Sequence, residues 1–302
     1  MFNKTSPFFQ FTYFCPRKDM LVSTLFFQKN LFDYSCFDTL YISNDLGGFY
    51  MLALVTGASS GIGKDIAREL AKRNYDVALV ARNTAALNEL KKELEHDNPN
   101  IKVSVHTCDL SSKENCYSLH EEVKDVDVLI NNAGFGAFGE FAELELEKEL
   151  TMIDTNIIAL HVLTKLYLQD MQKKNAGQIL NVASIAGFMP GPLMATYYAT
   201  KNYVVALSRA INKELKASKS NVKISVLCPG PVNTNFNSTA GVKFNLQGLS
   251  SNYVAEYAVE KMLSGKLIIL PGFLIKVARI FAEIVPDCIK ELVAYHMQKQ
   301  KM

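Results

Sequence analysis

From residue 51 onward, short uninterrupted apolar runs alternate with longer amphipathic stretches, and no other feature of the sequence restricts the fold as much. Apolar runs of this length predict strands that are buried on both faces, whereas the stretches between them have helical spacing and a charged outer side. Strand and helix in repeated alternation predict a parallel sheet with helices on both faces. We therefore expect an α/β protein with a doubly wound parallel sheet, whose ligands bind at the carboxyl ends of the strands.

The pattern predicts seven strands and, with the helices between them, a single domain at residues 51–271. The expected strands are Leu52–Thr56, Asp76–Ala81, Ile101–Cys108, Val126–Asn131, Gln178–Ser184, Lys223–Cys228 and Lys266–Leu270. The expected helices include Gly63–Arg73, Thr84–His96, Leu146–Lys173 and Tyr197–Ala217.

Composition argues against several classes of function. The chain has 32 basic and 30 acidic residues among 302, so its formal charge of +2 gives no broad attraction for nucleic acid, and no nucleic-acid partner is expected. Cysteine and histidine are scattered without metal-ligand spacing, so we expect reduced thiols, a cytoplasmic protein and no metal site. These residues are Cys15, Cys36, Cys108, Cys116, Cys228, Cys288, His96, His106, His120, His161 and His296.

The first fifty residues differ in composition from the rest. They hold 14 of the 31 Phe and Tyr residues, which leaves 17 for the other 252 positions. Charged residues interrupt every apolar stretch, the longest uncharged runs are too short to span a bilayer, and the pattern of a secretory signal fits poorly. We expect residues 1–50 to be a non-native or disordered extension of the domain.

One hypothesis is that translation starts at Met51. The preceding run 46–50 back-translates into a purine-rich ribosome-binding sequence a short distance before the Met51 codon. The alternative is an authentic extension that is disordered or touches a membrane. The intact mass of the protein expressed from its native gene distinguishes the two, because a mass that includes residues 1–50 would exclude a start at Met51.

A glycine-rich segment joins the first expected strand to the first expected helix, and it reads TGASSGIG from Thr56 to Gly63. At such a junction, backbone N–H groups and the positive helix end bind a pyrophosphate. Gly57 permits the tight turn, Gly61 lets the backbone approach phosphate, and Gly63 allows the helix to pack on the strand. The residues expected to bind a dinucleotide here are Gly57, Ser59, Ser60, Gly61, Ile62 and Gly63.

This segment resembles the T-G-x-x-x-G-x-G motif of the short-chain dehydrogenase/reductase family, and the resemblance covers residues 51 to about 271. The resemblance implies a Rossmann fold and an oxidoreductase that transfers a hydride between a nicotinamide cofactor and a carbonyl or secondary alcohol. A homodimer or homotetramer is expected on the same basis.

The residue that follows the second expected strand favours NADP(H) over NAD(H). An acidic side chain at this position would bind the ribose 2′-hydroxyl of NAD, but the sequence has Arg82, whose guanidinium pairs with a 2′-phosphate. The alternative is that Arg82 is an ordinary surface charge.

Three further strand ends match the cofactor site of the family. The run Asn131–Gly134, with the sequence NNAG, ends the fourth expected strand, and Cys228–Thr234 contains the family's P-G-x-V-x-T turn. The resemblance implies adenine contacts after the third strand, ribose contacts after the fourth and nicotinamide contacts after the sixth. These contacts involve Asp109, Leu110, Asn132, Ala133, Gly134, Pro229, Gly230, Val232 and Thr234.

A Y-x-x-x-K pattern at Tyr197 and Lys201 follows Ser184, which ends the fifth expected strand. This order of serine, tyrosine and lysine is the catalytic layout of the family. A second pair with the same spacing, Tyr257 and Lys261, lacks that context and is expected on a solvated helix face.

Residues four apart on a helix share a face, so the Lys201 ammonium is expected to lie near the Tyr197 hydroxyl and to lower its pKa. Tyr197 then donates a proton to the substrate oxygen during reduction and accepts one during oxidation. The resemblance implies that Ser184 hydrogen-bonds the substrate oxygen and that Lys201 also holds the nicotinamide ribose. It implies that Asn156 supports a water relay to the lysine.

The substrate is expected to be a small to medium, partly apolar carbonyl or alcohol compound. Apolar residues between the catalytic serine and tyrosine are expected to form its wall or, alternatively, to pack in the core. Segment Asn235–Ser251, which is rich in Asn, Ser, Thr and Gly, is expected to be a mobile lid. The wall residues are Phe188, Met189, Pro190, Leu193 and Met194.

Residues 272–302 form two amphipathic stretches, Phe273–Val285 and Asp287–Lys301, which Pro286 separates. Charged residues within them exclude a spanning helix. Their apolar side is expected to pack on the domain or at a subunit interface, and the alternative is contact with a membrane surface. Two alternative functions stay open: a peripheral membrane reductase of a lipid-like ketone, and a catalytically idle regulator that binds NADP.

Overall fold

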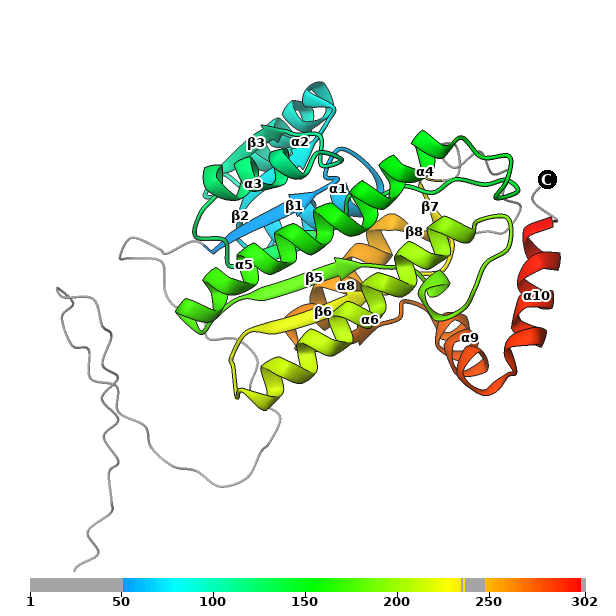
Figure 1. Cartoon of the computed structure of the whole chain (residues 1–302). Helices are drawn as coiled ribbons and strands as arrows, with labels where there is room; N and C mark the ends of the chain where they lie inside the picture. Colours follow the sequence, from blue (N-terminus) through cyan, green and yellow to red (C-terminus); the bar gives the residue numbers. More distant parts are fainter. Residues whose placement is uncertain (1–50, 235, 237–247, 300–302) are drawn as a thin grey trace, which may run out of the picture. The chain divides into compact units, whose positions relative to one another are not determined.

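The computed structural model describes residues 51–234, 236 and 248–299. The predictions for residues 1–50 and for most of the expected lid, Asn235–Ser251, lie outside the described residues. The described part comprises the α/β domain followed by two C-terminal helices (Figure 1).

Seven parallel strands form the central sheet of the described chain, in the order β3-β2-β1-β4-β5-β6-β9. The predicted doubly wound α/β fold is therefore confirmed, and the strands differ from the prediction only at their ends. The order reverses between β1 and β4, which is where open sheets of this kind bind ligands. The strands are β1 (Leu52–Thr56), β2 (Asp76–Ala81), β3 (Val103–Thr107), β4 (Val128–Asn131), β5 (Gln178–Val182), β6 (Lys223–Leu227) and β9 (Ile268–Ile269).

Helices connect the strands, and a short parallel pair, β7 (Val232–Asn233) with β8 (Leu249–Ser250), lies apart from the main sheet. The helix Lys113–Glu122 was not predicted, because it buries only Cys116, Leu119 and His120 and so has a weak apolar pattern. The helices are α1 (Gly61–Ala71), α2 (Thr84–Asp97), α3 (Lys113–Glu122), α4 (Leu146–Ile153), α5 (Leu160–Lys174), α6 (Ala195–Ala217), α8 (Ser251–Leu263), α9 (Phe273–Ile284) and α10 (Asp287–Lys299).

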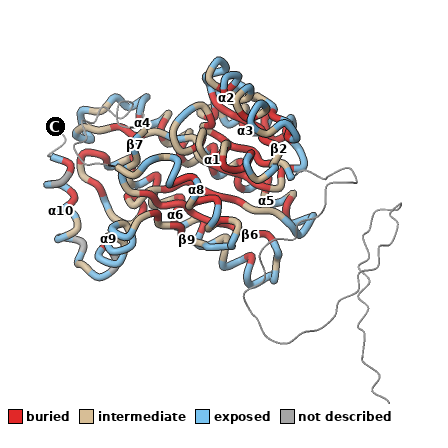
Figure 2. The backbone as a smooth tube through the Cα atoms, turned by 180° about the vertical axis from the view of Figure 1, so that it is seen from behind, coloured by how far each residue is buried: buried red, intermediate tan, exposed pale blue. Residues whose placement is uncertain are grey.

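Strand β1 shows how the sheet separates two hydrophobic layers. Ala53 and Val55 face a cluster formed with α1, α2 and α8, whereas Leu54 faces a cluster formed with α3 and α5. All three side chains are fully buried, as expected for a strand covered on both faces. Figure 2 shows this buried layer running through the middle of the domain.

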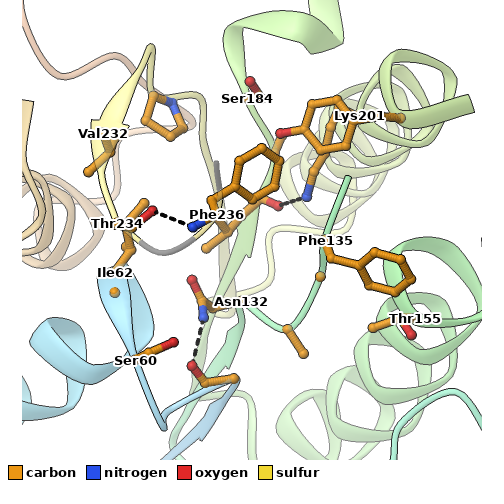
Figure 3. A pocket seen from close by; sticks show the side chains of 18 of the residues that line it. Ser60, Ile62, Asn132, Phe135, Thr155, Ser184, Lys201, Val232, Thr234 and Phe236 are labelled. Atoms are coloured by element: carbon orange, nitrogen blue, oxygen red, sulfur yellow. Dashed lines mark hydrogen bonds between the residues drawn. The ribbon is translucent and has the colours of Figure 1, made fainter. Parts of the chain in front are cut away.

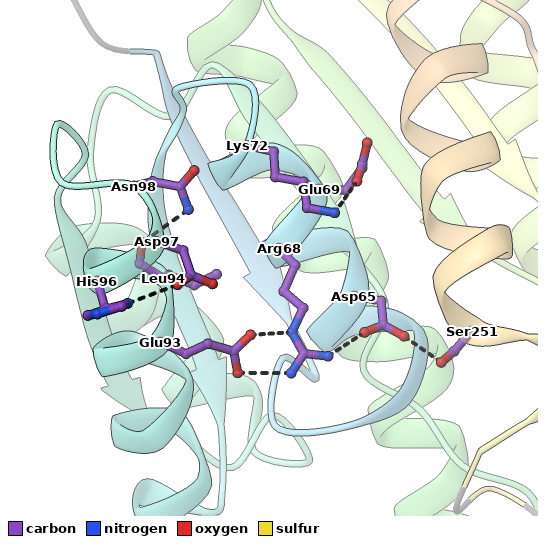
Figure 4. Close-up of polar contacts among 10 residues, drawn as sticks. All are labelled: Asp65, Arg68, Glu69, Lys72, Glu93, Leu94, His96, Asp97, Asn98 and Ser251. Carbon is purple, nitrogen blue, oxygen red and sulfur yellow. Dashed lines mark hydrogen bonds and ion pairs between the residues drawn. The ribbon is translucent and has the colours of Figure 1, made fainter.

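Polar contacts join α1 to the helices on either side of it (Figure 4). Arg68 on α1 donates to both carboxylate oxygens of Glu93 on α2, at 2.5 and 2.9 Å, and to Asp65 at 2.8 Å. Asp65 in turn accepts a hydrogen bond from Ser251 at the start of α8. The pKa of Arg68 is raised, chiefly by the hydrogen bond to Glu93, so this bidentate pair stays charged and fixes the helix that opens at the glycine-rich segment.

The helix predicted for Leu146–Lys173 is interrupted. A π-helical turn, Asp154–Ala159, separates α4 from α5. Within this turn Asn156 is 1% exposed, and its amide bonds the backbone of Phe135 and the hydroxyl of Thr200. A buried amide with partners outside its own helix explains why the regular hydrogen-bond ladder gives way here, and such turns are frequent at functional sites.

The two predicted amphipathic stretches of the tail are helices α9 and α10, and Pro286 lies between them. Ala282, Ala294 and Gln298 are buried, whereas Phe273, Leu274 and Ile284 are among the most exposed apolar residues of the described chain. Figure 2 shows that both helices are largely exposed or half-buried. In the described part of the chain, no helix has the length and apolar character that crossing a membrane requires.

Candidate active site

A cavity of about 610 Å³ lies at the carboxyl ends of the strands. The segments that follow β1, β2, β3, β4, β5 and β6 line it, together with the first turns of α6 and one residue of α10. Figure 3 shows Ser60 and Ile62 on one side and Ser184 and Lys201 on the other. Every residue predicted to be catalytic or to bind the cofactor lines this cavity except Gly63 and Asn156.

The glycine-rich segment has the backbone geometry that the sequence predicts. Gly57 and Gly61 have φ of +66° and +55°, and a Cβ atom on Gly57 would lie 2.9 Å from the Cα of Ala133. A Cβ on Gly63 would collide with the carbonyl oxygen of Gly57, so this residue packs the helix against the turn and does not line the cavity. The Ser60 side chain makes no capping hydrogen bond to α1. The first N–H groups of the helix therefore face a cavity wide enough for an anion.

Thr56 ties the glycine-rich segment to the end of β4. Its hydroxyl donates to the carbonyl of Ile130 at 3.1 Å and accepts from the N–H groups of Asn132 and Ala133 at 2.9 and 3.0 Å. The Asn132 amide donates back to the carbonyls of Thr56 and Gly57, at 3.1 and 3.2 Å, and Figure 3 shows one of these two bonds. Asn132 therefore holds the floor of the cavity in place as well as lining it.

Arg82, Asp109 and Leu110 lie together at one end of the cavity, as the resemblance implies. Asp109 accepts hydrogen bonds from the N–H and hydroxyl of Ser111, which hold its pKa below the usual range, and the charge of Arg82 lowers it further. Arg82 is exposed, and within the described chain no carboxylate lies within ion-pair distance of its guanidinium. We name this part, with the glycine-rich segment, the cofactor end.

Ser184, Tyr197 and Lys201 meet at the other end of the cavity. Ser184 caps a short 3₁₀ turn, Ile185–Phe188, by accepting from the N–H of Ala186 at 3.2 Å, and it hydrogen-bonds the Tyr197 hydroxyl. Tyr197 and Lys201 lie one turn apart on α6, and the Lys201 Nζ is 5.8 Å from the centre of the Tyr197 ring. That Nζ also donates to the carbonyl of Val182 at 3.0 Å, which anchors it at the end of β5.

The prediction that Lys201 lowers the pKa of Tyr197 is wrong for the protein without a bound cofactor. Burial raises the pKa of the Tyr197 hydroxyl, and the hydrogen bond with Ser184 only partly opposes this. Burial also lowers the pKa of Lys201 to about 8. Both shifts have the same physical cause, since the charged forms of a phenol and an amine lose hydration in a closed site.

Asn156 lies behind the cavity wall. Its Oδ1 accepts from the N–H of Phe135 at 3.1 Å, and its Nδ2 donates to the Phe135 carbonyl at 2.9 Å and to Thr200 at 3.1 Å. A Cβ on Gly134 would lie 2.7 Å from the Asn156 oxygen, which explains the glycine in the NNAG run. Asn156 is a positioning residue in this arrangement, and its role in a water relay stays a prediction.

The segment after β6 covers the glycine-rich turn. Pro229, Gly230, Val232 and Thr234 all line the cavity. A Cβ on Gly61 would lie 3.1 Å from the Thr234 methyl carbon, so Thr234 stands directly against the turn. Its hydroxyl accepts from the N–H of Phe236 at 3.3 Å (Figure 3).

The predicted apolar wall is wrong for most of its members. Of the five predicted wall residues, only Met194 lines the cavity. Phe188 packs in a separate cluster, 5.2 Å from the Arg279 guanidinium, and Leu193 is buried with φ of +64°. Met189 is half-buried and Pro190 is exposed, so the alternative of packing in the core holds for Phe188 and Leu193 only.

Other residues form the wall near Tyr197, and the sequence did not single them out. Phe135, Tyr198, Phe236 and Gln298 line the cavity there, and the Phe236 ring lies 5.4 Å from that of Tyr197. The place of Tyr198 in the cavity wall could have been predicted, because it directly follows Tyr197 in the sequence. Gln298 carried no signal, because 100 residues separate it from Tyr198, whose hydroxyl it contacts. With Met194, these residues form what we name the substrate end.

The second Y-x-x-x-K pair lies away from the cavity, but its face is not simply solvated. Tyr257 is partly buried against the core cluster of α1 and α8, and the Lys261 Nζ lies 5.5 Å from its ring. No group of three His, Cys, Asp or Glu residues in the described chain has the geometry to hold a metal ion.

Comparison with known proteins places these features in context. The family model for short chain dehydrogenases matches residues 51–243. An uncharacterized oxidoreductase of Staphylococcus epidermidis is 36% identical over 188 residues, which cover 61% of this chain and 78% of that protein. An NADP-dependent 3-hydroxy acid dehydrogenase of Schizosaccharomyces pombe is 37% identical over 189 residues, covering 61% and 72%. A short-chain dehydrogenase from Sphingobium yanoikuyae, solved in complex with NADPH, aligns with a TM-score of 0.70 and 27% identity, covering 78% of this chain and 96% of that one.

Proposed function

This chain belongs to the short-chain dehydrogenase family and is an NAD(P)-dependent oxidoreductase. We propose that it reduces a carbonyl substrate with NADPH and that Tyr197 is the proton donor. One observation carries the proposal. Ser184, Tyr197 and Lys201, from two elements of the fold, meet in the same cavity as the glycine-rich turn. A regulator that only binds a dinucleotide has no need for that meeting.

The cavity fits a nicotinamide dinucleotide. Side chains at Gly57, Gly61 or Gly63 would either strain the backbone or occupy the turn, so the backbone amides stay open to phosphate oxygens. The preference for NADP(H) rests on Arg82, whose exposed guanidinium has the charge and the planar donors to bind a 2′-phosphate.

Proton transfer is the part of the reaction that this chain supplies. When bound, the reduced cofactor supplies the hydride. The hydroxyl of Ser184 donates a hydrogen bond to the carbonyl oxygen, and the Tyr197 hydroxyl gives the same oxygen its proton. The phenol is protonated at neutral pH and therefore carries the proton that the step needs, while burial, which raises its pKa, makes it a weaker acid than a free phenol.

The Lys201 ammonium stabilises the negative charge that proton transfer leaves on Tyr197. After transfer, Tyr197 is a phenolate in a buried site, and such a charge needs a partner. The Lys201 ammonium lies over the same ring at 5.8 Å from its centre, and with a pKa of about 8 it is mostly protonated at neutral pH.

We also infer a cytoplasmic location and assembly as a homodimer or homotetramer. Cys108, Cys116, Cys228 and Cys288 are free thiols, which fits a reducing compartment. Apolar side chains on α9 are exposed and are available to pack against a second copy. Light scattering that gives the mass of one chain would contradict the assembly.

The experiment that tests the reaction measures NADPH oxidation with a panel of ketones and aldehydes, for the parent and for Tyr197→Phe. Loss of a general acid is expected to lower kcat by about 100- to 10,000-fold. Tyr203→Phe is the matched control, because Tyr203 lies on the same helix and bonds exposed His161 instead of facing the cavity. Equal activity of parent and Tyr197→Phe would refute the mechanism. NADPH binding without turnover of any carbonyl would favour the idle regulator.

A further inference from the structure

Helix α9 packs its inner side against two backbone segments that lie on either side of Ser184 in the fold. One is the 3₁₀ turn that Ser184 caps, Ile185–Phe188, and the other is the turn after β6, which begins at Cys228. None of the described side chains of α9 lines the cavity. Any effect of this helix on the reaction must therefore act through these two segments.

Arg279 of α9 contacts the 3₁₀ turn. Its guanidinium lies 5.2 Å from the centre of the Phe188 ring, which is a cation–π distance. Phe188 is the last residue of the turn that Ser184 caps, and a Cβ atom on Gly187 would lie 2.7 Å from the carbonyl oxygen of Lys201. The turn is therefore held between the backbone of α6 and the Arg279 side chain.

Ile275 of α9 contacts the turn after β6. A Cβ atom on Gly230 would lie 2.2 Å from the Cδ1 atom of Ile275 and 3.0 Å from its Cγ1 atom. The φ of Gly230 lies outside the left-handed region, so a side chain would fit the backbone there. The Ile275 side chain thus occupies the space that a side chain at position 230 would need.

The charge of Arg279 also acts on the start of the turn after β6. Burial raises the pKa of the Cys228 thiol to about 12, and the positive charges of Arg279 and Lys201 oppose that rise. Such an effect requires that the charges lie near the thiol. Arg279 is therefore close to one segment while its guanidinium lies over a ring of the other.

Hydrogen bonds join the two segments to each other on both sides of Ser184. The N–H of Ile185 donates to the carbonyl of Pro229 at 2.9 Å, and the N–H of Ala183 donates to the carbonyl of Leu227 at 2.8 Å. Ser184 and Pro229 both line the cavity. A shift of either segment must therefore change the position of the Ser184 hydroxyl in the cavity.

We propose that Arg279 and Ile275 are positioning residues for the reduction, because they fix the two segments that hold the Ser184 hydroxyl against the reacting carbonyl. This rests on the proposed reduction of a carbonyl at Tyr197. A misplacement of about 1 Å, caused by a change far from the reacting atoms, can lower a rate by about 100-fold. The phosphates of NADPH bind at the cofactor end, so loss of either side chain should lower kcat more than the affinity for NADPH.

The test compares Arg279→Met with the parent in NADPH oxidation with the ketone panel. Methionine keeps much of the side-chain length but removes the charge over Phe188, so kcat is expected to fall about 10- to 100-fold with a nearly unchanged Kd for NADPH. Arg279→Lys retains a cation and is expected to recover part of kcat, whereas a role in packing alone predicts the same kcat for both variants. Lys276→Met is the control, because it removes a charge of the same helix that lies over Tyr257 of α8 instead.

Phe188→Leu tests whether Arg279 acts through the Phe188 ring. If it does, Phe188→Leu alone lowers kcat, and the double variant Arg279→Met/Phe188→Leu is no slower than Arg279→Met. Losses that multiply in the double variant would overturn the proposal. A parent-like kcat in Arg279→Met would also overturn it.

Ile275→Ala is the second variant, and it keeps the proposal testable if Arg279→Met folds poorly. It opens space beside Gly230 and is expected to lower kcat by about tenfold. Val277→Ala, at an exposed position of the same helix, is expected to retain the kcat of the parent. Equal kcat values for Ile275→Ala and Val277→Ala would count against α9 as the positioning element.

Cofactor fluorescence separates this inference from the proposed reaction, because it requires no turnover. The emission of bound NADPH comes from its reduced nicotinamide ring and is expected to change in Arg279→Met and Ile275→Ala, but not in Lys276→Met or Val277→Ala. That result supports positioning even if no ketone is reduced, in which case only the reaction fails. Unchanged emission in every variant rejects positioning, and loss of activity in Tyr197→Phe then still retains the reaction.

Discussion

The two ends of the cavity are built differently. Backbone groups and glycines that sit directly on the buried sheet form the cofactor end, and Thr56 and Asn132 lock two of its segments together. Side chains form the substrate end, and one of them comes from α10, a helix with a largely exposed outer side. The first end is as rigid as the core beneath it, whereas the second can change its residues without disturbing the sheet. The cofactor end therefore determines the type of reaction, and the substrate end determines which substrate binds.

The largest effect is expected for Gly63→Ala at the cofactor end. The new Cβ would collide with the backbone of Gly57, so the turn must open and NADPH affinity should fall by about 100-fold or more, since overpacking of this kind costs about 1–3 kcal/mol before any lost phosphate contact is counted. Calorimetric titration measures the change. Gly265→Ala is the control, because an alanine is strained at its φ of +75° but the residue does not line the cavity, and the change should alter stability alone.

Thr56→Val tests whether the cofactor end is locked to the core. The variant keeps the shape but leaves the N–H groups of Asn132 and Ala133 without their acceptor, and we expect a loss of about 2–4 kcal/mol in the free energy of unfolding. Urea denaturation measures it, beside Thr107→Val at an exposed strand end. Equal stability of the two variants would show that the lock is unimportant.

Arg82→Asp should change the cofactor and not the substrate. Removing a charge-assisted pair with the 2′-phosphate, worth about 1.5–3 kcal/mol, is expected to shift the ratio of kcat/KM for NADPH over NADH by about 10- to 100-fold toward NADH. Arg209→Asp, at an exposed site on α6, serves as the control. An unchanged ratio would count against Arg82 as the determinant.

Ala294→Glu tests the substrate end by changing the buried side of α10. Ala294 is buried on the inner side of α10, and a carboxylate there should displace the helix, because an unpaired buried charge is strongly unfavourable. We expect KM for the ketone to rise about tenfold while the Kd for NADPH stays constant. The neighbouring Tyr295→Glu points to the exposed side and should leave both values unchanged. A parallel rise in both constants would mean that the two ends are not independent.

The smallest effect is a pH dependence. Burial lowers the pKa of Lys201 to about 8, so its ammonium is lost as pH rises through that value, and the phenolate left on Tyr197 then lacks its partner. For the reduction, kcat/KM should fall by about fourfold between pH 7 and 8.5, in line with titration of one group of this pKa. Lys201→Arg should move the decline to higher pH, because a guanidinium stays charged. A flat profile in both proteins would contradict the role of Lys201.

The same division explains what could be predicted from sequence. Residues of the cofactor end are neighbours in the chain or follow successive strands, so Gly57, Arg82 and Asn132 were identified from local patterns, and their place in the cavity agrees. The spacing of Tyr197 and Lys201 predicted that they lie close together. The lowered pKa that it predicted for Tyr197 was wrong, because burial, which raises that pKa, depends on elements far away in the chain.

The substrate end was poorly predicted for a related reason. Whether Phe188 and Leu193 face the cavity or the core depends on the turn before α6, including the positive φ of Leu193, and an apolar run does not reveal that turn. Gln298 enters the cavity only because α9 and α10 fold back over the domain. Packing between segments that are distant in the sequence produces no periodic pattern of apolar residues.

The hydrogen bond between Gln298 and Tyr198 spans 100 residues, and it sets an order of events during synthesis. At about 5–20 residues per second, a ribosome needs about 5–20 seconds to add the glutamine after the tyrosine. Once Thr234 has been added within that interval, the nucleotide-binding loops exist and the reaction chamber still lacks one wall. The nascent protein can thus acquire its dinucleotide before it acquires any means of choosing what to reduce.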